Sequence, residues 1–332
     1  MKKFLSVTIL MTVLLFTLVN ADTMHSGTIT SDETWYPSGN VHIITGNVTV
    51  NTGVTLTIMP GVIVKFYSNQ SLIVSGSLIT EATADSQIVF TSIKDDSYGG
   101  DTNGDNTATS PAPGDWRRIF INGADASGVF DHCVVKYGGR GTVPFYPMLQ
   151  CDAGSLTVSN SVIGNSDWCG IYCYSGLLII SNNIFMNNGL YAAHILNVTG
   201  VLNISNINNT GNGNQVNGLV LSGCTITGNS SWTVNQNFPY VIDGVTIDTG
   251  ATLTLVPGTL VKFLAGAWIK VNGSLEALGT PDSQIVFTSI KDDGYGGDTN
   301  GDSTATSPAP GDWDAISIEG TDATVVFDHC VV

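Results

Sequence analysis

Short runs in which apolar and polar residues alternate fill most of the chain. Val64 and Phe66 flank Lys65, and Ile88 and Phe90 are separated by one residue. Alternation with a period of two predicts half-buried β-strands, so we expect Val64 and Phe66 in a core and Lys65 in solvent. Gly, Asn, Asp and Ser interrupt the runs, and the 38 glycines suit tight turns with positive φ. The pattern predicts an all-β fold.

One long pattern occurs twice. Residues 35–135 align with residues 232–332 at a constant offset of 197 and without a gap. Both copies contain the motifs TLTxxPG, VKF, GSL and DSQIVFTSIKDD in the same order. A repeat of this kind decides the architecture, so it is considered before any single element. The chain therefore divides into copy one (35–135), intervening coils (136–231) and copy two (232–332).

The intervening coils have a shorter repeat. Ser159-Asn160, Ser181-Asn182 and Ser205-Asn206 recur at spacings of 22 and 24 residues, each after an apolar pair. A unit of this length without helical periodicity is typical of one coil of a solenoid, and the LxxLxL frame of leucine-rich repeats is absent. Stacked coils place their strands about 4.8 Å apart, and a chain of this length makes on the order of ten coils.

Asparagine and cysteine are expected at special places in the stack. Asn165, Asn187 or Asn188, and Asn212 recur near the same corner, where amide side chains can bond along the stack as a ladder. Cys133 and Cys330 occupy the same slot of the two copies, in the motif DHCVV. Equivalent slots favour inward-facing core thiols, and a disulfide remains the alternative for the six cysteines.

The motifs resemble a known group of proteins. An entry tryptophan, the segment GVTLTIMPGVIVKF, a GSL turn and IVFTS are similar to the right-handed parallel β-helix repeat proteins of the bacterial secreted or surface type. That group shares the pectate-lyase-like superfold. The resemblance implies a right-handed parallel β-helix, a single-stranded solenoid, with two long inserted loops. It also implies an alternative function, that of a polysaccharide lyase or glycoside hydrolase.

The N-terminus has the pattern of a signal peptide. Lys2 and Lys3 precede an apolar run from Phe4 to Val19, and Ala21 follows as a small residue at the cleavage position. The run is shorter than the roughly 20 residues of a spanning helix. We expect a signal peptide at 1–21, a β-helix at 22–332 that does not span a membrane after cleavage, and a secreted or cell-surface location.

Copy two stops at Val332, where copy one continues from Val135 into further strand residues. A solenoid that ends within a strand leaves its inward face without a polar cap. We therefore expect this sequence to be a piece of a longer protein.

The composition narrows the choice of partners. The formal charge is −16, only 11% of residues are charged, and the sequence contains three arginines. Binding of phosphate backbones needs clustered Lys and Arg, so we expect no nucleic-acid partner. Divalent cations and polysaccharides, including glycans of a host or cell surface, remain as expected partners.

The two long loops, residues 94–116 and 291–313, differ from the rest of the repeat. From Asp85 to Trp116 the copies match at 30 of 32 positions, whereas from Trp35 to Ala84 they match at 19 of 50. Recent recombination within the gene would produce this difference. The other explanation is that the loops have a role that depends on their side chains.

The loops contain candidate ligands for calcium. Asp101, Asn103 and Asp105 alternate around a glycine, as in the first half of extracellular calcium loops, but Ala112 stands where a bidentate acid is expected. The remaining oxygens would come from neighbouring acids or carbonyls, and a turn without an ion is the alternative. The full set of predicted ligands is Asp95, Asp96, Asp101, Asn103, Asp105 and Asp115, with Asp292, Asp293, Asp298, Asn300, Asp302 and Asp312 in copy two.

Aromatic residues beside the loops are candidates for stacking on sugar rings: Tyr98, Trp116, Tyr295 and Trp313. Core packing is the alternative for the two tryptophans. No catalytic residue is assigned, because Arg117-Arg118 becomes Asp314-Ala315 in copy two and adjacent acids such as Asp95 and Asp96 point to opposite faces of a strand. We expect a non-catalytic protein for adhesion or carbohydrate contact.

Overall fold

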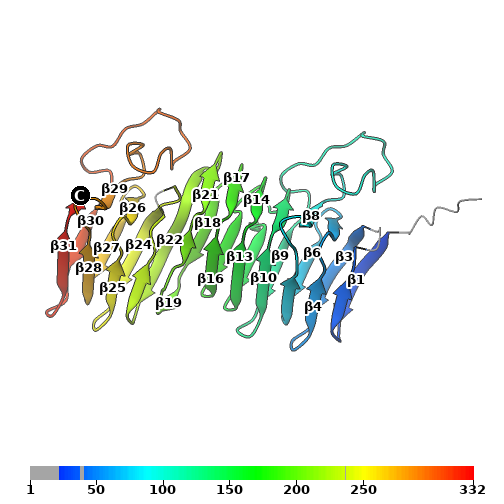
Figure 1. The fold of residues 1–332 in the computed structure, drawn as a ribbon, viewed down its shortest axis with the longest axis horizontal. Coiled ribbons are helices and arrows are strands. Elements are labelled where there is room, and N and C mark those ends of the chain that lie inside the picture. The colour runs from blue at the N-terminus through cyan, green and yellow to red at the C-terminus, as the bar shows by residue number, and fades with distance from the viewer. Residues whose placement is uncertain (1–21, 38–40, 236) are drawn as a thin grey trace, which may run out of the picture.

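The fold is a parallel β-solenoid of about 11 turns, as expected from the repeats (Figure 1). The structure is a computed structural model that describes residues 22–37, 41–235 and 237–332. The predicted signal peptide, 1–21, lies outside the described residues. Strands are the only regular elements in the described ranges, and every pair of neighbouring strands in the stack is parallel. Within those ranges no helix is long and apolar enough to cross a membrane.

Each turn of the solenoid contributes strands to three faces. One face stacks β5 (Ile63–Phe66), β8 (Ile88–Ser92), β11 (Cys133–Lys136), β14 (Val162–Gly164), β17 (Ile184–Met186) and β21 (Thr210–Asn212). The next stacks β6 (Ser71–Val74), β9 (Arg118–Asn122), β12 (Leu149–Asp152), β15 (Ile171–Tyr174) and β18 (Tyr191–Leu196). The third stacks β2 (Glu33–Trp35), β4 (Thr55–Ile58), β7 (Ser77–Thr80), β10 (Ser127–Asp131), β13 (Ser155–Ser159), β16 (Leu177–Ser181) and β20 (Asn206–Ile207).

Copy two repeats this arrangement. Its faces contain β26 (Leu260–Phe263), β29 (Ile285–Ser289) and β32 (Cys330–Val331), then β27 (Trp268–Val271) and β30 (Ala315–Ile318), then β23 (Ser230–Trp232), β25 (Thr252–Leu255), β28 (Ser274–Leu278) and β31 (Thr324–Asp328). The long strands β3 (His42–Val50), β22 (Val216–Ile226) and β24 (Tyr240–Ile247) bend from one face to the next. The short β19 (Thr199–Gly200) pairs with β22, and β1 (Thr23–Ile29) pairs with β3.

The core consists of inward side chains stacked in register. Val64, Phe90, Val135, Ile163 and Phe185 follow one another in a single column across five turns, and each is fully buried. The period-two alternation of these strands puts every second residue in that interior. Burial of such columns is the main stabilising contribution, because each strand alone has too little apolar surface to fold.

The expected asparagine ladder exists at one corner of the intervening coils. The side-chain oxygen of Asn188 accepts from the backbone N–H of Ser166 at 3.1 Å, and Asn214 receives two hydrogen bonds from Asn188 at 3.0 and 2.7 Å. Asn165 and Asn187 turn the chain just before the ladder, with φ of 58° and 53°. Asn214, rather than the predicted Asn212, continues the ladder because it lies one turn above Asn188.

The cysteines of the DHCVV motif face inward, as expected. Cys133 is fully buried, and the sulfur of Cys330 packs against the same interior in the last turn. All six cysteines are free thiols in the structure. Burial raises the pKa of Cys133 to about 12, so this thiol is unreactive at neutral pH.

The prediction that Lys65 is solvated was wrong. Lys65 and its counterpart Lys262 are both 0% exposed, although each alternates with inward residues as the sequence pattern required. The reason is that each lysine does point away from the core, but the long loop folds back over it. The alternation identified the outer face of the strand correctly and could not show that a loop covers this face.

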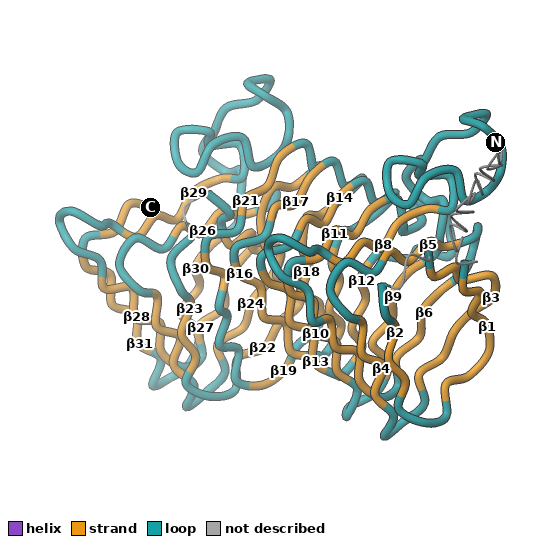
Figure 2. The backbone as a smooth tube through the Cα atoms, turned by 45° about the vertical axis from the view of Figure 1, so that its right-hand side comes forward, coloured by secondary structure: helices purple, strands orange, loops and turns teal. Residues whose placement is uncertain are grey.

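The two long loops project from the same side of the solenoid, one toward each end (Figure 1). The first connects β8 to β9 and the second connects β29 to β30. In Figure 2 both are continuous loop without strand segments. They are inserted between two strands of one turn, so the stacking of the turns continues beneath them.

Candidate functional site

A buried lysine ties each long loop to the solenoid. In loop one the Nζ atom of Lys65 donates to the carbonyl oxygen of Gly100 at 2.8 Å and to Thr102 Oγ1 at 2.7 Å. In loop two Lys262 makes the equivalent bonds to Gly297 and Thr299, at 3.0 and 2.7 Å. Sequence reasoning missed this role, although the repeated VKF motif in both copies was an available signal.

Two of the predicted calcium ligands instead hold the base of loop one. Asp95, which is 2% exposed, accepts from Thr91 Oγ1 at 2.6 Å and from the backbone N–H of Ser97 at 3.2 Å. Asp115 accepts from Lys94 Nζ at 2.7 Å and from Ser92 Oγ at 2.7 Å. Their carboxylates are therefore occupied by protein donors.

Loop two is closed in the same way. Asp292 accepts from Thr288 Oγ1 at 2.6 Å and from the backbone N–H of Gly294 at 3.0 Å. Asp312 accepts from Lys291 Nζ at 2.6 Å, and this hydrogen bond lowers the pKa of Asp312 to about 2. Asp312 therefore stays ionised near neutral pH, and the hydrogen bonds of Asp292 and Asp312 together close the base of loop two.

The other predicted ligands come together in loop one. Asp96, Asp101 and Asp105 each place a carboxylate oxygen within 4.8 Å of the others. Asp101 also accepts from the backbone N–H groups of Asp105 and Asn106, at 3.0 and 2.9 Å, which fixes the tight turn of the DTNGD motif. Three carboxylates at this spacing repel one another, and a cation between them would relieve the repulsion.

Two oxygens at this cluster lack any hydrogen-bond partner. They are Asp96 Oδ1 and Asn103 Oδ1, and both atoms are buried. The amide of Asn103 is held in this orientation because its Nδ2 donates to Asp105 at 2.8 Å and to Thr109 Oγ1 at 3.1 Å. A buried acceptor without a donor costs about 1 to 3 kcal/mol. The cluster therefore offers unpaired oxygens as well as negative charge.

Loop two repeats the main hydrogen bonds of this arrangement. Asp293 Oδ1 and Asn300 Oδ1 are again buried without a partner. Asp302 donates its backbone N–H to Asp298 Oδ1 at 3.0 Å. Burial raises the pKa of Asp293, and the Asp298 carboxylate raises it further. This direction is expected where several carboxylates share a site.

The predicted sugar-stacking residues divide into two kinds. Trp116 is fully buried, its ring stacks on Phe66 at 4.3 Å, and its Nε1 donates to the carbonyl of Lys136 at 2.8 Å. Trp313 is partly buried and stacks on Phe263 at 4.2 Å. The structure thus places Trp116 in the core, where it offers no face to a sugar.

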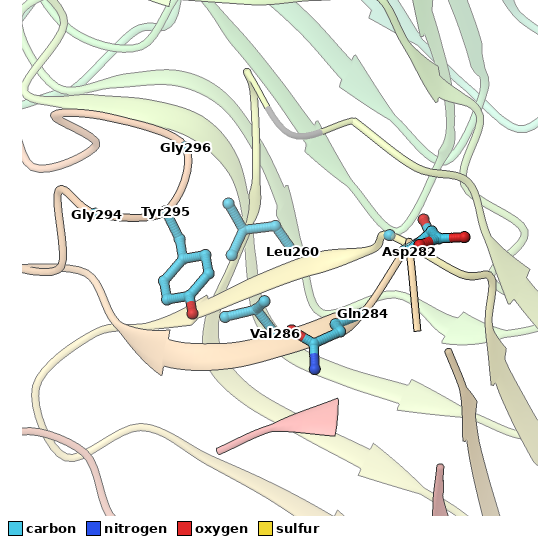
Figure 3. Close-up of a pocket in the computed structure, with 9 residues that line it drawn as sticks. Leu260, Asp282, Gln284, Val286, Gly294, Tyr295 and Gly296 are labelled. Atoms are coloured by element: carbon cyan, nitrogen blue, oxygen red, sulfur yellow. The ribbon is translucent and has the colours of Figure 1, made fainter. Parts of the chain in front are cut away.

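The tyrosines lie nearer the surface. Tyr98 is half-buried, and Tyr295 is 39% exposed. Tyr295 lines a pocket of about 300 Å³ together with Leu260, Val286, Asp282 and Gln284 (Figure 3). A ring beside polar side chains at an open pocket is suited to contact with a small polar ligand such as a sugar.

A Ser, a His and an Asp also meet on the second face. His194 Nε2 lies 2.8 Å from Ser222 Oγ, which donates to Asp243 Oδ2 at 3.0 Å. In a nucleophilic triad the serine donates to the histidine, and the carboxylate holds the other ring nitrogen. Here the serine proton is given to the carboxylate, and His194 Nδ1 has no partner. This order does not activate the serine.

Comparisons with known proteins yield one short match. No protein-family model matches the chain, and no solved structure matches it. Protein bark beetle of Drosophila melanogaster is 42% identical over 52 residues, which are 15% of this chain. The match covers 2% of that protein's length. It is too short to assign a family or a function.

Proposed function

We propose that this chain is a non-catalytic, secreted or cell-surface β-helix protein whose two long loops are ordered by calcium. In this proposal the solenoid is right-handed, of the pectate-lyase-like kind, and presents carbohydrate-binding or adhesive surfaces on a stiff rod. Each turn contacts only its neighbours, so the spacing of surface features along the rod is fixed.

The observation that carries the calcium proposal is the pair of unpaired buried oxygens in each loop. Asp96 Oδ1 and Asn103 Oδ1 lie at a cluster that also contains Asp101 and Asp105, so carboxylate and amide oxygens converge without a matching donor. Calcium takes six to eight oxygen ligands, from carboxylates, amides, carbonyls and water, in flexible geometry. A cation there would satisfy both oxygens and neutralise the carboxylates.

The ligand set is smaller than the sequence indicated. Asp95 and Asp115 lie outside the group of converging carboxylates, so the proposed site has three carboxylates and one amide, with water and backbone carbonyls completing it. A site that lacks a bidentate acid belongs to the weak extracellular class, with a dissociation constant of roughly 10⁻⁴ to 10⁻³ M. Saturation at about 100 times that constant would stabilise each bound loop by about 2.7 kcal/mol.

Limited proteolysis tests the proposal loop by loop. We expect millimolar calcium to protect residues 99–112 and the equivalent residues 296–309, compared with the protein in chelator. The double variant Asp101→Asn, Asp105→Asn should lose protection in loop one and keep it in loop two, which serves as an internal control. Asp85→Asn, an exposed acid outside the cluster, should change neither loop.

Two results of this experiment would contradict the calcium proposal. Equal cleavage of both wild-type loops with calcium and with chelator would leave only the turn interpretation, in which the acids bind backbone N–H groups alone. Protection by magnesium at the same concentration would show that charge rather than calcium coordination orders the loops.

A further inference from the structure

Two arginine side chains lie over one tyrosine ring, and the third arginine pairs with the same tyrosine through its backbone. The guanidinium carbons of Arg118 and Arg117 lie 4.7 and 5.1 Å from the centroid of the Tyr146 ring. Arg140 pairs with Tyr146 across a short hairpin through two backbone hydrogen bonds, of 2.6 and 3.0 Å. The chain has 27 acidic and 11 basic side chains, so the cluster of arginines near Tyr146 is a positive surface on an acidic protein.

The protein compensates these positive charges only in part: burial lowers the pKa of Arg118, and the Asp152 carboxylate raises it by less. The ion pairs within the described ranges all use lysine or histidine, and none uses an arginine. The Nε atoms of Arg117 and Arg118 are buried without a hydrogen-bond partner. Arg118 Nη1 donates to the neutral Gln150, and Arg140 Nε donates to Thr142 Oγ1 at 2.9 Å. Half-buried guanidinium groups that form no ion pair favour an external anion at their accessible nitrogens.

Aromatic rings extend from the arginines across the second face. Phe145, which is 49% exposed, stacks on Trp168 with ring centroids 5.3 Å apart. Trp168 lies 5.6 Å from Tyr172, and Tyr172 meets the His194 ring edge-on at 5.3 Å. The surface defined by Arg117, Arg118, Arg140, Tyr146, Trp168 and Tyr172 is called the arginine–aromatic face below.

The strands give this face a regular spacing. Phe120 of β9, Gln150 of β12 and Tyr172 of β15 occupy one outward column in register. Neighbouring strands are about 4.8 Å apart, so Phe120 and Tyr172, two strands apart, lie on the order of 10 Å from each other. Two linked pyranose rings have a similar length, so successive disaccharide units of a polymer can meet equivalent positions on every second strand.

We propose that the arginine–aromatic face binds a carboxylated polysaccharide. Sugar rings present C–H faces that pack on Trp168 and Tyr172, and Arg117 and Arg118 offer planar donors that match a carboxylate. This inference rests on the proposed role in carbohydrate contact and adds its place and ligand class. The chain carries a net charge of −16, which opposes every polyanion and most strongly a sulfated or phosphate polymer with more than one charge per sugar.

Copy two has no such face. Asp314 and Ala315 stand where copy one has Arg117 and Arg118, and the hairpin with Tyr146 belongs to the intervening coils. A cation on the same surface of copy two, Lys270, is already paired with Glu319 at 3.1 Å. The protein should therefore bind the polymer at one place, and Lys270 provides a matched control.

Affinity electrophoresis through gels containing alginate, a polymer of uronic acids, tests the proposal. Chelator in the gel keeps calcium-dependent effects of the loops, and calcium bridging of alginate, out of the measurement. We expect alginate to retard the full chain, and carboxyl-reduced alginate, in which the acids are alcohols, to retard it far less. Arg117→Gln with Arg118→Gln should weaken binding at least about tenfold, because two charge-assisted contacts are lost.

Matched variants distinguish the face from general charge. Lys270→Gln should bind alginate as the wild type does. Tyr172→Ala should weaken binding while the arginines remain, because the stacking surface is lost. Arg117→Lys with Arg118→Lys keeps the positive charge but removes the planar guanidinium groups, so we expect binding between that of the wild type and that of the double glutamine variant. Circular dichroism of each variant shows whether the solenoid has folded.

Three results would overturn the proposal in different ways. Equal retardation by alginate and its reduced form, unchanged in the arginine variant, would reject the acidic ligand and leave carbohydrate contact standing. Stronger binding of dextran sulfate than of alginate, at equal charge, would show that the face selects charge alone. If no glycan in the set binds the wild type, the proposed role in carbohydrate contact fails as well. Cleavage of alginate during the assay would contradict the non-catalytic proposal.

Discussion

The Nζ atom of Lys65 lies 2.8 Å from the carbonyl oxygen of Gly100, so a side chain of β5 holds the middle of a loop that follows β8. Lys65 is fully buried by that loop. We expect Lys65→Met to keep the solenoid and loosen loop one, because the carbonyl of Gly100 and the hydroxyl of Thr102 lose their common donor. In chelator, cleavage within residues 99–112 should become faster.

Loop two is the control for this variant, since Lys262 holds it independently. Its cleavage rate should not change. Identical cleavage rates for loop one in the wild type and in Lys65→Met would mean that the hydrogen bonds of Asp95 and Asp115 alone hold the loop.

Truncation of an inward aromatic residue should destabilise the rod. Phe66 is fully buried and stacks on Trp116, so Phe66→Ala should lower the free energy of unfolding by about 3 to 5 kcal/mol. Tyr67, the next residue, is 42% exposed, and Tyr67→Ala should change it by less than about 0.5 kcal/mol. Urea unfolding followed by circular dichroism measures both. Similar losses for the two variants would contradict the assignment of Phe66 to the core and of Tyr67 to the surface.

Removal of residues 97–112 should leave the stacked turns intact. The loop is inserted between β8 and β9, and its deletion uncovers Lys65, which can then be hydrated. We expect an unchanged β-sheet circular dichroism spectrum. Loss of that spectrum would show that the loop contributes to the fold itself and is more than a cover.

Acid should destabilise the solenoid through His194. Burial lowers its pKa from 6.5 to about 4, so between these values the unfolded chain takes up a proton that the folded chain refuses. Stability contributed by the neutral ring is complete above pH 6.5 and is lost as pH falls toward 4, by about 3 kcal/mol in all. The unfolding free energy of His194→Gln, measured from pH 7 to pH 4, should fall less steeply than that of the wild type. Parallel slopes would place the acid sensitivity in other groups, such as His25, whose pKa is also lowered to about 4.

The stack was predictable because it depends on local alternation repeated many times. Leu56 stands between two threonines, as its counterpart Leu253 does in copy two, and the register follows once the repeat is found. The positions of Lys65 and Trp116 were not predictable in the same way. Their burial depends on where a loop of irregular backbone folds, and side-chain periodicity contains no information about that path.

The candidate sites show the same division. The DTNGD acids converge through a turn that is local in sequence, so Asp101 and Asp105 could be paired from spacing alone. Asp95 and Asp96 are adjacent, and only the backbone of the loop decides which of them binds protein donors. Arg117 and Trp168 are far apart in sequence, and stacking of the turns brings their surroundings together, so the arginine–aromatic face had no local signature.

Both long loops project from one side of a stiff rod, so the distance between them is set by the turns in between (Figure 1). In the proposed adhesive role, two equivalent loops on a rigid spacer would act as a bivalent receptor. A surface that touches both loops would meet the second at a high effective concentration once the first is bound. Insertion or removal of whole turns in the intervening coils would then change the avidity without altering any contact. Duplication of the module thus provides a second loop at a fixed distance from the first.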